Sequence, residues 1–133
     1  TFTEIMTCAG VCMFSSFAMS EEILYEYIEA VTGRNFKAED SYNVGLRIYT
    51  MRHAFNLREG IKPKDLTLTN RAIGKPPLTA GPLEGVTVDV DKLGRNFFEE
   101  VDWDMETGKP SLDSLKKLEL DKVIEDLYGE KAS

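Results

Sequence analysis

The chain has 133 residues, of which 42% are hydrophobic and 29% charged, and its formal net charge at pH 7 is -7. This composition is that of a folded protein and excludes intrinsic disorder, and the length predicts a single domain over 1–133. The acidic balance, with sixteen Lys and Arg scattered along the chain, argues against a nucleic-acid partner.

The N-terminal stretch sets further expectations. The chain starts at Thr1 and soon enters the apolar stretch 5–19, which predicts that an N-terminal portion is missing; a remnant of tag removal is the alternative. No apolar run approaches the roughly 20 residues that cross a bilayer, so we expect no membrane partner. The two cysteines are too few for a disulfide scaffold, which favours a reducing compartment and a cytoplasmic location.

The first predicted helix spans 21–32. Ser20 precedes it as an N-cap, and Glu21 and Glu22 place negative charge at the positive end of the helix dipole. Gly33 follows where a left-handed C-terminal cap is expected.

A longer helix is predicted over 38–59, ended by Gly60 and Pro63. Apolar residues occur on two of its faces, so we expect it to be the central packing element. Gly45 would allow another helix to approach closely. The apolar stripe consists of Val44, Ile48, Met51 and Phe55, and the second face carries Leu46 and Tyr49.

Periodicity is lost over 61–85, where glycine and proline are frequent. Loops longer than about 15 residues in a compact domain are usually functional or spread over another part of the protein. We therefore expect this loop to cover a partner domain that lies outside the chain.

Helical pattern returns over 91–103, followed by a turn at 104–108. Ser111 is predicted to cap a short helix, and Asp121 to cap a last helix that reaches Leu127. The short helix would bury Leu112, Leu115 and Leu118. Since the only strand-like alternation is Val86-Thr87-Val88, the predicted class is all-α: a multihelical domain with one long irregular loop.

The stretch Thr7–Cys12 combines two soft ligands, Cys8 and Cys12, with small residues, so backbone amides could approach an anionic cofactor. A zinc or iron–sulfur centre usually needs four ligands, and the sequence offers neither a third Cys nor a nearby His. From the residues alone, two buried core cysteines are the favoured interpretation.

Two other positions could carry chemistry. His53 is the only histidine, but its place within a predicted helix favours a structural or solvated role over a catalytic one. The run Phe55–Gly60 brings an arginine, a carboxamide and a carboxylate to a helix end. This indicates a capping and ion-pair cluster, and contact with a cofactor or partner domain is the alternative.

Taken in order, several motifs resemble the C-terminal region of the tungsten-dependent aldehyde ferredoxin oxidoreductase family. The resemblance covers essentially the whole chain, and the Phe-Asn-x-Arg-Glu-Gly run is its most specific part. The motifs are Gly10-Val11-Cys12-Met13-Phe14, Phe55-Asn56-Leu57-Arg58-Glu59-Gly60, and Val101-Asp102-Trp103-Asp104 followed by Gly108-Lys109-Pro110.

The resemblance implies a multihelical fold and two cofactors in the complete protein. These are a tungsten or molybdenum ion held between two pterins, and a four-iron (4Fe-4S) cluster whose ligands are three cysteines from an upstream Cys-x-x-Cys-x-x-x-Cys run and one from the turn matched here. Cys12 occupies that fourth position, and Cys8 is left as a small packing residue. Thr7, Val11 and Met13 stand where cofactor contacts are expected, although Thr7 replaces the usual Asp and cannot act as a carboxylate.

The resemblance also implies a function. The expected parent oxidises an aldehyde substrate to a carboxylic acid with ferredoxin as the electron acceptor. Its catalytic acid–base residues lie upstream, so no catalytic residue is expected in this chain, which would pack against the N-terminal domains of the parent and be inactive alone. The alternative is a non-catalytic helical subunit or interaction module that keeps the scaffold without the redox centre.

Overall fold

The computed structural model describes residues 1–129, and their regular secondary structure is entirely helical, which confirms the all-α class. Outside the helices, the described part of the chain has only two isolated β-bridges. Among the same residues, no helix combines the length and apolar character that a membrane span requires. In chain order the elements are α1 (Phe2–Cys8), η1 (Met13–Phe17), α2 (Glu21–Thr32), α3 (Ala38–Arg58), η2 (Pro63–Asp65), α4 (Val90–Glu100), α5 (Leu112–Lys117) and α6 (Asp121–Tyr128).

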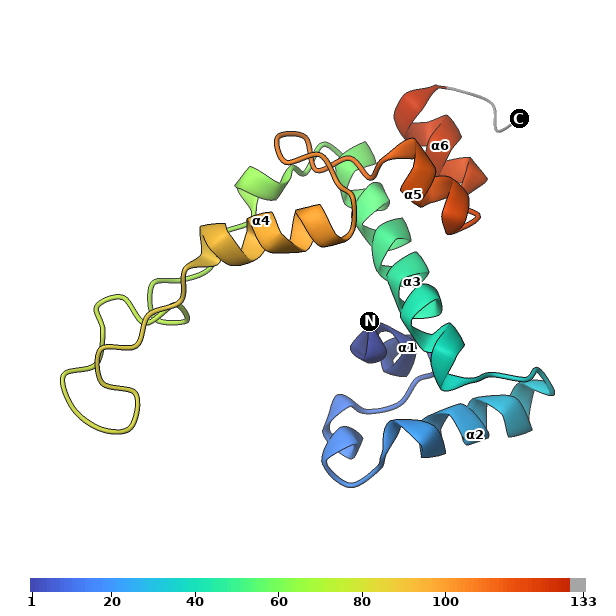
Figure 1. Ribbon diagram of the computed structural model, residues 1–133, viewed down its shortest axis with the longest axis horizontal. Coiled ribbons are helices and arrows are strands. Elements are labelled where there is room, and N and C mark those ends of the chain that lie inside the picture. The colour runs from blue at the N-terminus through green and yellow to red at the C-terminus, as the bar shows by residue number, and fades with distance from the viewer. Residues whose placement is uncertain (130–133) are drawn as a thin grey trace.

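The long helix α3 organises the molecule, as its two apolar faces predict. Helices α1 and α2 lie at its N-terminal end, and α5 and α6 pack beside its C-terminal half (Figure 1). Most of the buried hydrophobic residues accordingly form two clusters, to which only Val101 and Trp103 among the buried hydrophobic residues described do not belong. The N-terminal cluster is Ile5, Met6, Leu24 and Tyr25, and the C-terminal cluster is Ala54, Leu115, Leu118, Leu120, Val123 and Ile124.

The faces of α3 are divided between these two clusters. Val44 and Ile48 pack against the N-terminal cluster, whereas Leu46 packs against the C-terminal cluster. Met51 and Phe55 continue the predicted stripe in sequence but are exposed. The predicted stripe is therefore half-buried in its first part, where it packs against the N-terminal cluster, and exposed in its second.

Helix α1 crosses α3 at Gly45, which confirms the close approach expected there. A Cβ atom added to Gly45 would lie 2.5 Å from the Thr1 carbonyl oxygen. Only hydrogen at this position leaves room for the α1 backbone.

Several predicted helix ends are confirmed. Gly33 follows α2 in the left-handed conformation, with φ of 68°. Ser111 caps α5, and its hydroxyl oxygen accepts a hydrogen bond from the Ser114 amide at 3.0 Å. Ser20 stands at the N-cap of α2 as predicted, but its side chain makes no capping hydrogen bond to the helix backbone.

Two predicted boundaries are wrong. The helix predicted over 91–103 ends at Glu100, because Asp102 adopts φ of 57° and turns the backbone out of the helix. Asp121 does not cap the last helix, since Leu120 is the N-cap and Asp121 is the first helical residue. Its carboxylate still lies in the first turn, where the helix dipole favours negative charge.

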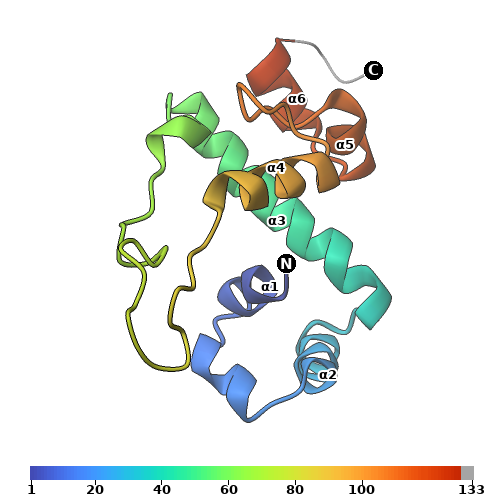
Figure 2. The ribbon, with the colours of Figure 1, turned by 60° about the vertical axis from the view of Figure 1, so that its left-hand side comes forward.

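The long irregular segment is confirmed and forms what we call the arm, residues 66–89. The arm extends away from the helices (Figures 1 and 2) and has internal hydrogen bonds, including one from the Val88 amide to the Ile73 carbonyl at 3.0 Å. At Gly74, with φ of 72°, a Cβ atom would lie 2.5 Å from the Val86 carbonyl oxygen. The arm thus has a defined shape although nearly all of its residues are exposed.

Candidate functional site

The candidate site is the cysteine turn, residues 8–13, which joins α1 to η1. Helix α1 ends at Cys8, and Gly10 adopts φ of 71°, a conformation that glycine permits without strain. The Val11 amide then donates a hydrogen bond to the Met6 carbonyl at 2.9 Å. This closes the helix end and places Cys12 at the N-cap of η1.

Both cysteines of the turn are exposed free thiols, so the interpretation of two buried core cysteines is wrong. Cys8 is therefore not a buried packing residue, because it lies on the open wall of an apolar groove. The Cys12 carbonyl accepts hydrogen bonds from the Ser15 amide at 2.9 Å and the Ser15 hydroxyl at 2.7 Å. These bonds hold the backbone of Cys12 and leave its side chain exposed.

The other three candidate residues surround the same turn in different settings. The Thr7 hydroxyl donates a hydrogen bond to the Thr3 carbonyl at 2.8 Å, so its proton is already engaged within α1. Val11 is half-buried and packs against the N-terminal cluster. Met13 is 56% exposed at the start of η1. The structure thus brings Val11, Cys12 and Met13 to one corner, with Val11 facing inward.

Within the part of the chain that the structure describes, Cys12 has too few potential metal ligands near it to hold a metal centre. Among residues 1–129, no group of three or more His, Cys, Asp or Glu side chains could bind a metal ion. A single exposed thiol could serve as one thiolate ligand of a metal centre whose other ligands come from polypeptide outside the described residues.

His53 occupies a structural position, in agreement with the sequence interpretation. Its Nε2 atom lies 2.9 Å from the Gly108 carbonyl oxygen, and its ring stacks on Trp103 with centroids 4.1 Å apart. Burial lowers the pKa of His53, with the bond to Gly108 opposing the shift. Tyr49 and Phe97 also contact the Trp103 ring, completing an aromatic cluster that the sequence pattern did not reveal.

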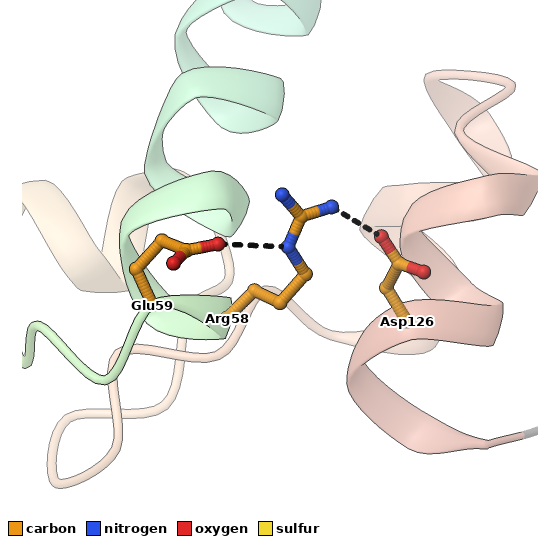
Figure 3. Close-up of polar contacts among 3 residues, drawn as sticks. All are labelled: Arg58, Glu59 and Asp126. Carbon is orange, nitrogen blue, oxygen red and sulfur yellow. Dashed lines mark hydrogen bonds and ion pairs between the residues drawn. The ribbon is translucent and has the colours of Figure 1, made fainter.

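The Phe55–Gly60 run forms the predicted ion-pair cluster (Figure 3). Arg58 Nε lies 3.2 Å from a Glu59 carboxylate oxygen, and Arg58 Nη1 lies 3.4 Å from an Asp126 carboxylate oxygen. The guanidinium also covers the Phe55 ring at 5.0 Å. The arginine therefore links the end of α3 to α6, and its charge is balanced within the chain.

An apolar groove beside the cysteine turn is the feature that sequence reasoning missed. It has a volume of about 560 Å³, lies between α1, η1, α2 and α3, and no charged side chain of the described residues lines it. Tyr27 and Val31 on α2 face it and are exposed. Their helical spacing was readable as an apolar face, but the sequence did not show that residues of α3, such as Val44 and Ile48, line the same groove.

The structure is that of a multihelical all-α domain, in which a turn closed by Gly10 presents the exposed thiol of Cys12. The chain belongs to the family described as aldehyde ferredoxin oxidoreductase, domains 2 and 3, whose family model matches residues 1–120. This confirms the resemblance drawn from the sequence motifs.

The curated relatives carry the corresponding name. The chain is 29% identical over 123 residues to a tungsten-containing aldehyde ferredoxin oxidoreductase of Pyrococcus abyssi, covering 92% of the chain and 20% of that protein. It is 30% identical over 117 residues to the Pyrococcus furiosus protein of the same name, covering 87% of the chain and 19% of that protein. The chain thus spans about a fifth of the length of the curated relatives it matches. No solved structure matches it.

Proposed function

We propose that this chain is the C-terminal part of an oxidoreductase that converts aldehydes to carboxylic acids and passes the electrons to ferredoxin. The observation that carries the proposal is the family match over residues 1–120. The names of the relatives supply the aldehyde, the tungsten and the ferredoxin. Since the chain spans about a fifth of those relatives, the N-terminal domains of the parent would hold the rest of the active site.

We assign Cys12 as one ligand of the four-iron cluster expected in the parent. Its exposed thiol and its hydrogen-bonded backbone support this role, and an exposed thiolate is a suitable iron ligand. When bound, the cluster would carry single electrons from the tungsten or molybdenum bis-pterin toward ferredoxin. The chain itself would supply one cluster ligand and no catalytic acid or base.

The remainder of the cysteine turn would position that ligand. Gly10 allows the backbone to reverse within two residues, and Val11 anchors the turn to the N-terminal cluster. Met13 would offer an exposed thioether to a neighbouring pterin. The Thr7 hydroxyl already donates within α1, so we expect it to act toward a pterin only as a hydrogen-bond acceptor.

The test compares Cys12→Ser with Cys8→Ser in the parent protein, purified without oxygen. We expect Cys12→Ser to lose most of its iron and acid-labile sulfide, because serine is a poor ligand for this cluster. Cys8→Ser should retain both, since Cys8 lies on the groove wall. Unchanged iron and sulfide in Cys12→Ser would contradict the assignment.

The coding sequence upstream of Thr1 separates this proposal from a non-catalytic helical module. An open reading frame that continues upstream and encodes a Cys-x-x-Cys-x-x-x-Cys run would support the enzyme proposal. A start codon directly before Thr1 would exclude it. In either case the 133-residue chain alone should not oxidise aldehydes with a viologen dye as acceptor. Activity of that chain would show that it contains its own redox centre.

A further inference from the structure

The chain exposes far more surface than a self-contained domain of its size. Its accessible surface is 9780 Å². A globular monomer of this mass exposes about 7,000 Å², which leaves an excess of roughly 2,700 Å². Such an excess is of the order that one partner contributes to a large obligate interface.

Part of this excess surface is the apolar groove beside the cysteine turn. Val31 and Tyr27, which line it from α2, are 85% and 62% exposed. Apolar residues of α3, such as Val44, line the same groove. A surface so apolar and without lining charges among the described residues fits an occupant with uncharged, apolar side chains.

We infer that this groove is the docking site for an apolar segment of the N-terminal part of the same parent polypeptide. The inference rests on the proposed function and specifies where the two parts of the parent meet. Two observations favour this occupant over a second copy of the chain. The first is that the relatives are about five times longer than the matched region, so additional chain is present in them.

The second observation is the position of the cysteine turn. Since residues 1–129 offer no complete set of metal ligands, any metal centre at Cys12 needs ligands from chain outside this one. Those ligands must come within bonding distance of the same metal centre. Cys8 and Val11 of the same turn line the groove, so additional chain that meets Cys12 would lie beside the groove.

Hydrogen exchange of the α2 amides tests this docking site. We expect these amides to exchange at least about tenfold more slowly in the parent polypeptide than in the 133-residue chain. Val31→Lys in the parent should restore fast exchange, because a charge cannot enter the occupied groove without losing its hydration. The matched control is Glu26→Lys, an exposed position of α2 outside the groove, which should keep the slow exchange.

Val31→Lys in the 133-residue chain checks that the substitution does not simply unfold α2. Because Val31 is 85% exposed there, the helical circular dichroism and the α2 exchange of this variant should be unchanged. Equal α2 exchange in parent and chain would overturn the inference. So would protection that appears in the chain alone as its concentration rises, since a second copy would then be the occupant.

Iron analysis of the parent separates failure of this inference from failure of the proposed function. A parent that protects α2 but contains no iron would contradict the redox function and keep the docking site. A parent that contains iron but leaves α2 unprotected would contradict only the docking site.

Discussion

At the residue scale, His53 is the clearest example of a side chain whose role comes from its surroundings. Its ring lies between α3 and the turn that follows α4, stacked on Trp103, with Nε2 bonded to the Gly108 carbonyl. Because a carbonyl oxygen only accepts, Nε2 must carry the proton of the neutral ring. Nothing in this arrangement positions the ring for acid–base chemistry.

The lowered pKa of His53 predicts a pH dependence of stability. Below about pH 6.5 the unfolded chain takes up a proton that the folded chain resists. The contribution of neutral His53 to the free energy of unfolding is therefore complete above about pH 6.5. It is lost as the pH falls toward the folded-state pKa of His53.

Between about pH 7.5 and 5.5, we expect the unfolding free energy to fall less in His53→Gln than in the unsubstituted 133-residue chain, as measured by urea unfolding. The difference should stay well below the roughly 1.4 kcal/mol of one full pKa unit, because the ring is only half-buried. Gln can still donate a hydrogen bond to the Gly108 carbonyl. A general loss of packing in the variant would lower its stability at every pH and would leave the pH slope as it is. Identical pH slopes would contradict the prediction.

Residue roles were predictable where they depended on neighbours in sequence. Ser111 and Gly33 act as caps as expected, since a cap involves only the adjacent turn. Exposure of Cys8 was not predictable, because it depends on how α2 packs across from α1. The partner of Arg58 on α6, Asp126, is likewise 68 residues away.

At the element scale, the crossing of α1 over α3 depends on one glycine. Gly45 and Gly94 are both interior glycines of helices, but their surroundings differ. A Cβ atom at Gly45 would overlap Thr1, whereas a Cβ atom at Gly94 would meet nothing within 4 Å. Substitution of Gly94 therefore reports the effect of helix propensity, whereas substitution of Gly45 also reports the packing of α1 on α3.

We expect Gly94→Ala to stabilise the chain by about 0.5–1 kcal/mol, the usual gain in helix propensity. Gly45→Ala should instead destabilise it by roughly 1–3 kcal/mol, because α1 must shift to relieve the overlap. Thermal and urea unfolding measure both changes. Equal stabilisation by the two substitutions would show that α1 does not pack closely on α3.

At the scale of the whole molecule, the two buried clusters share only α3. Leu24 lies in the N-terminal cluster and Leu115 in the C-terminal cluster, and both are almost completely buried. The two ends should therefore respond separately to damage in either cluster.

We expect Leu24→Ala and Leu115→Ala each to lower the unfolding free energy of their own end by about 2–5 kcal/mol. Hydrogen exchange should accelerate mainly in α1 and α2 for Leu24→Ala, and mainly in α5 and α6 for Leu115→Ala. The two variants are matched controls for each other. A uniform acceleration over all helices in both would indicate one cooperative unit.

The sequence by itself determined the helical class, most helix positions and the long irregular arm, whereas Cys12 became the candidate ligand only through the family resemblance. Those features follow from apolar periodicity, capping residues and local motifs, which act over a few residues. Only the tertiary structure decided the two clusters, the aromatic cluster around Trp103 and the groove beside the cysteine turn. Each of these depends on which distant helix faces meet, and that is set by packing of side chains far apart in the chain.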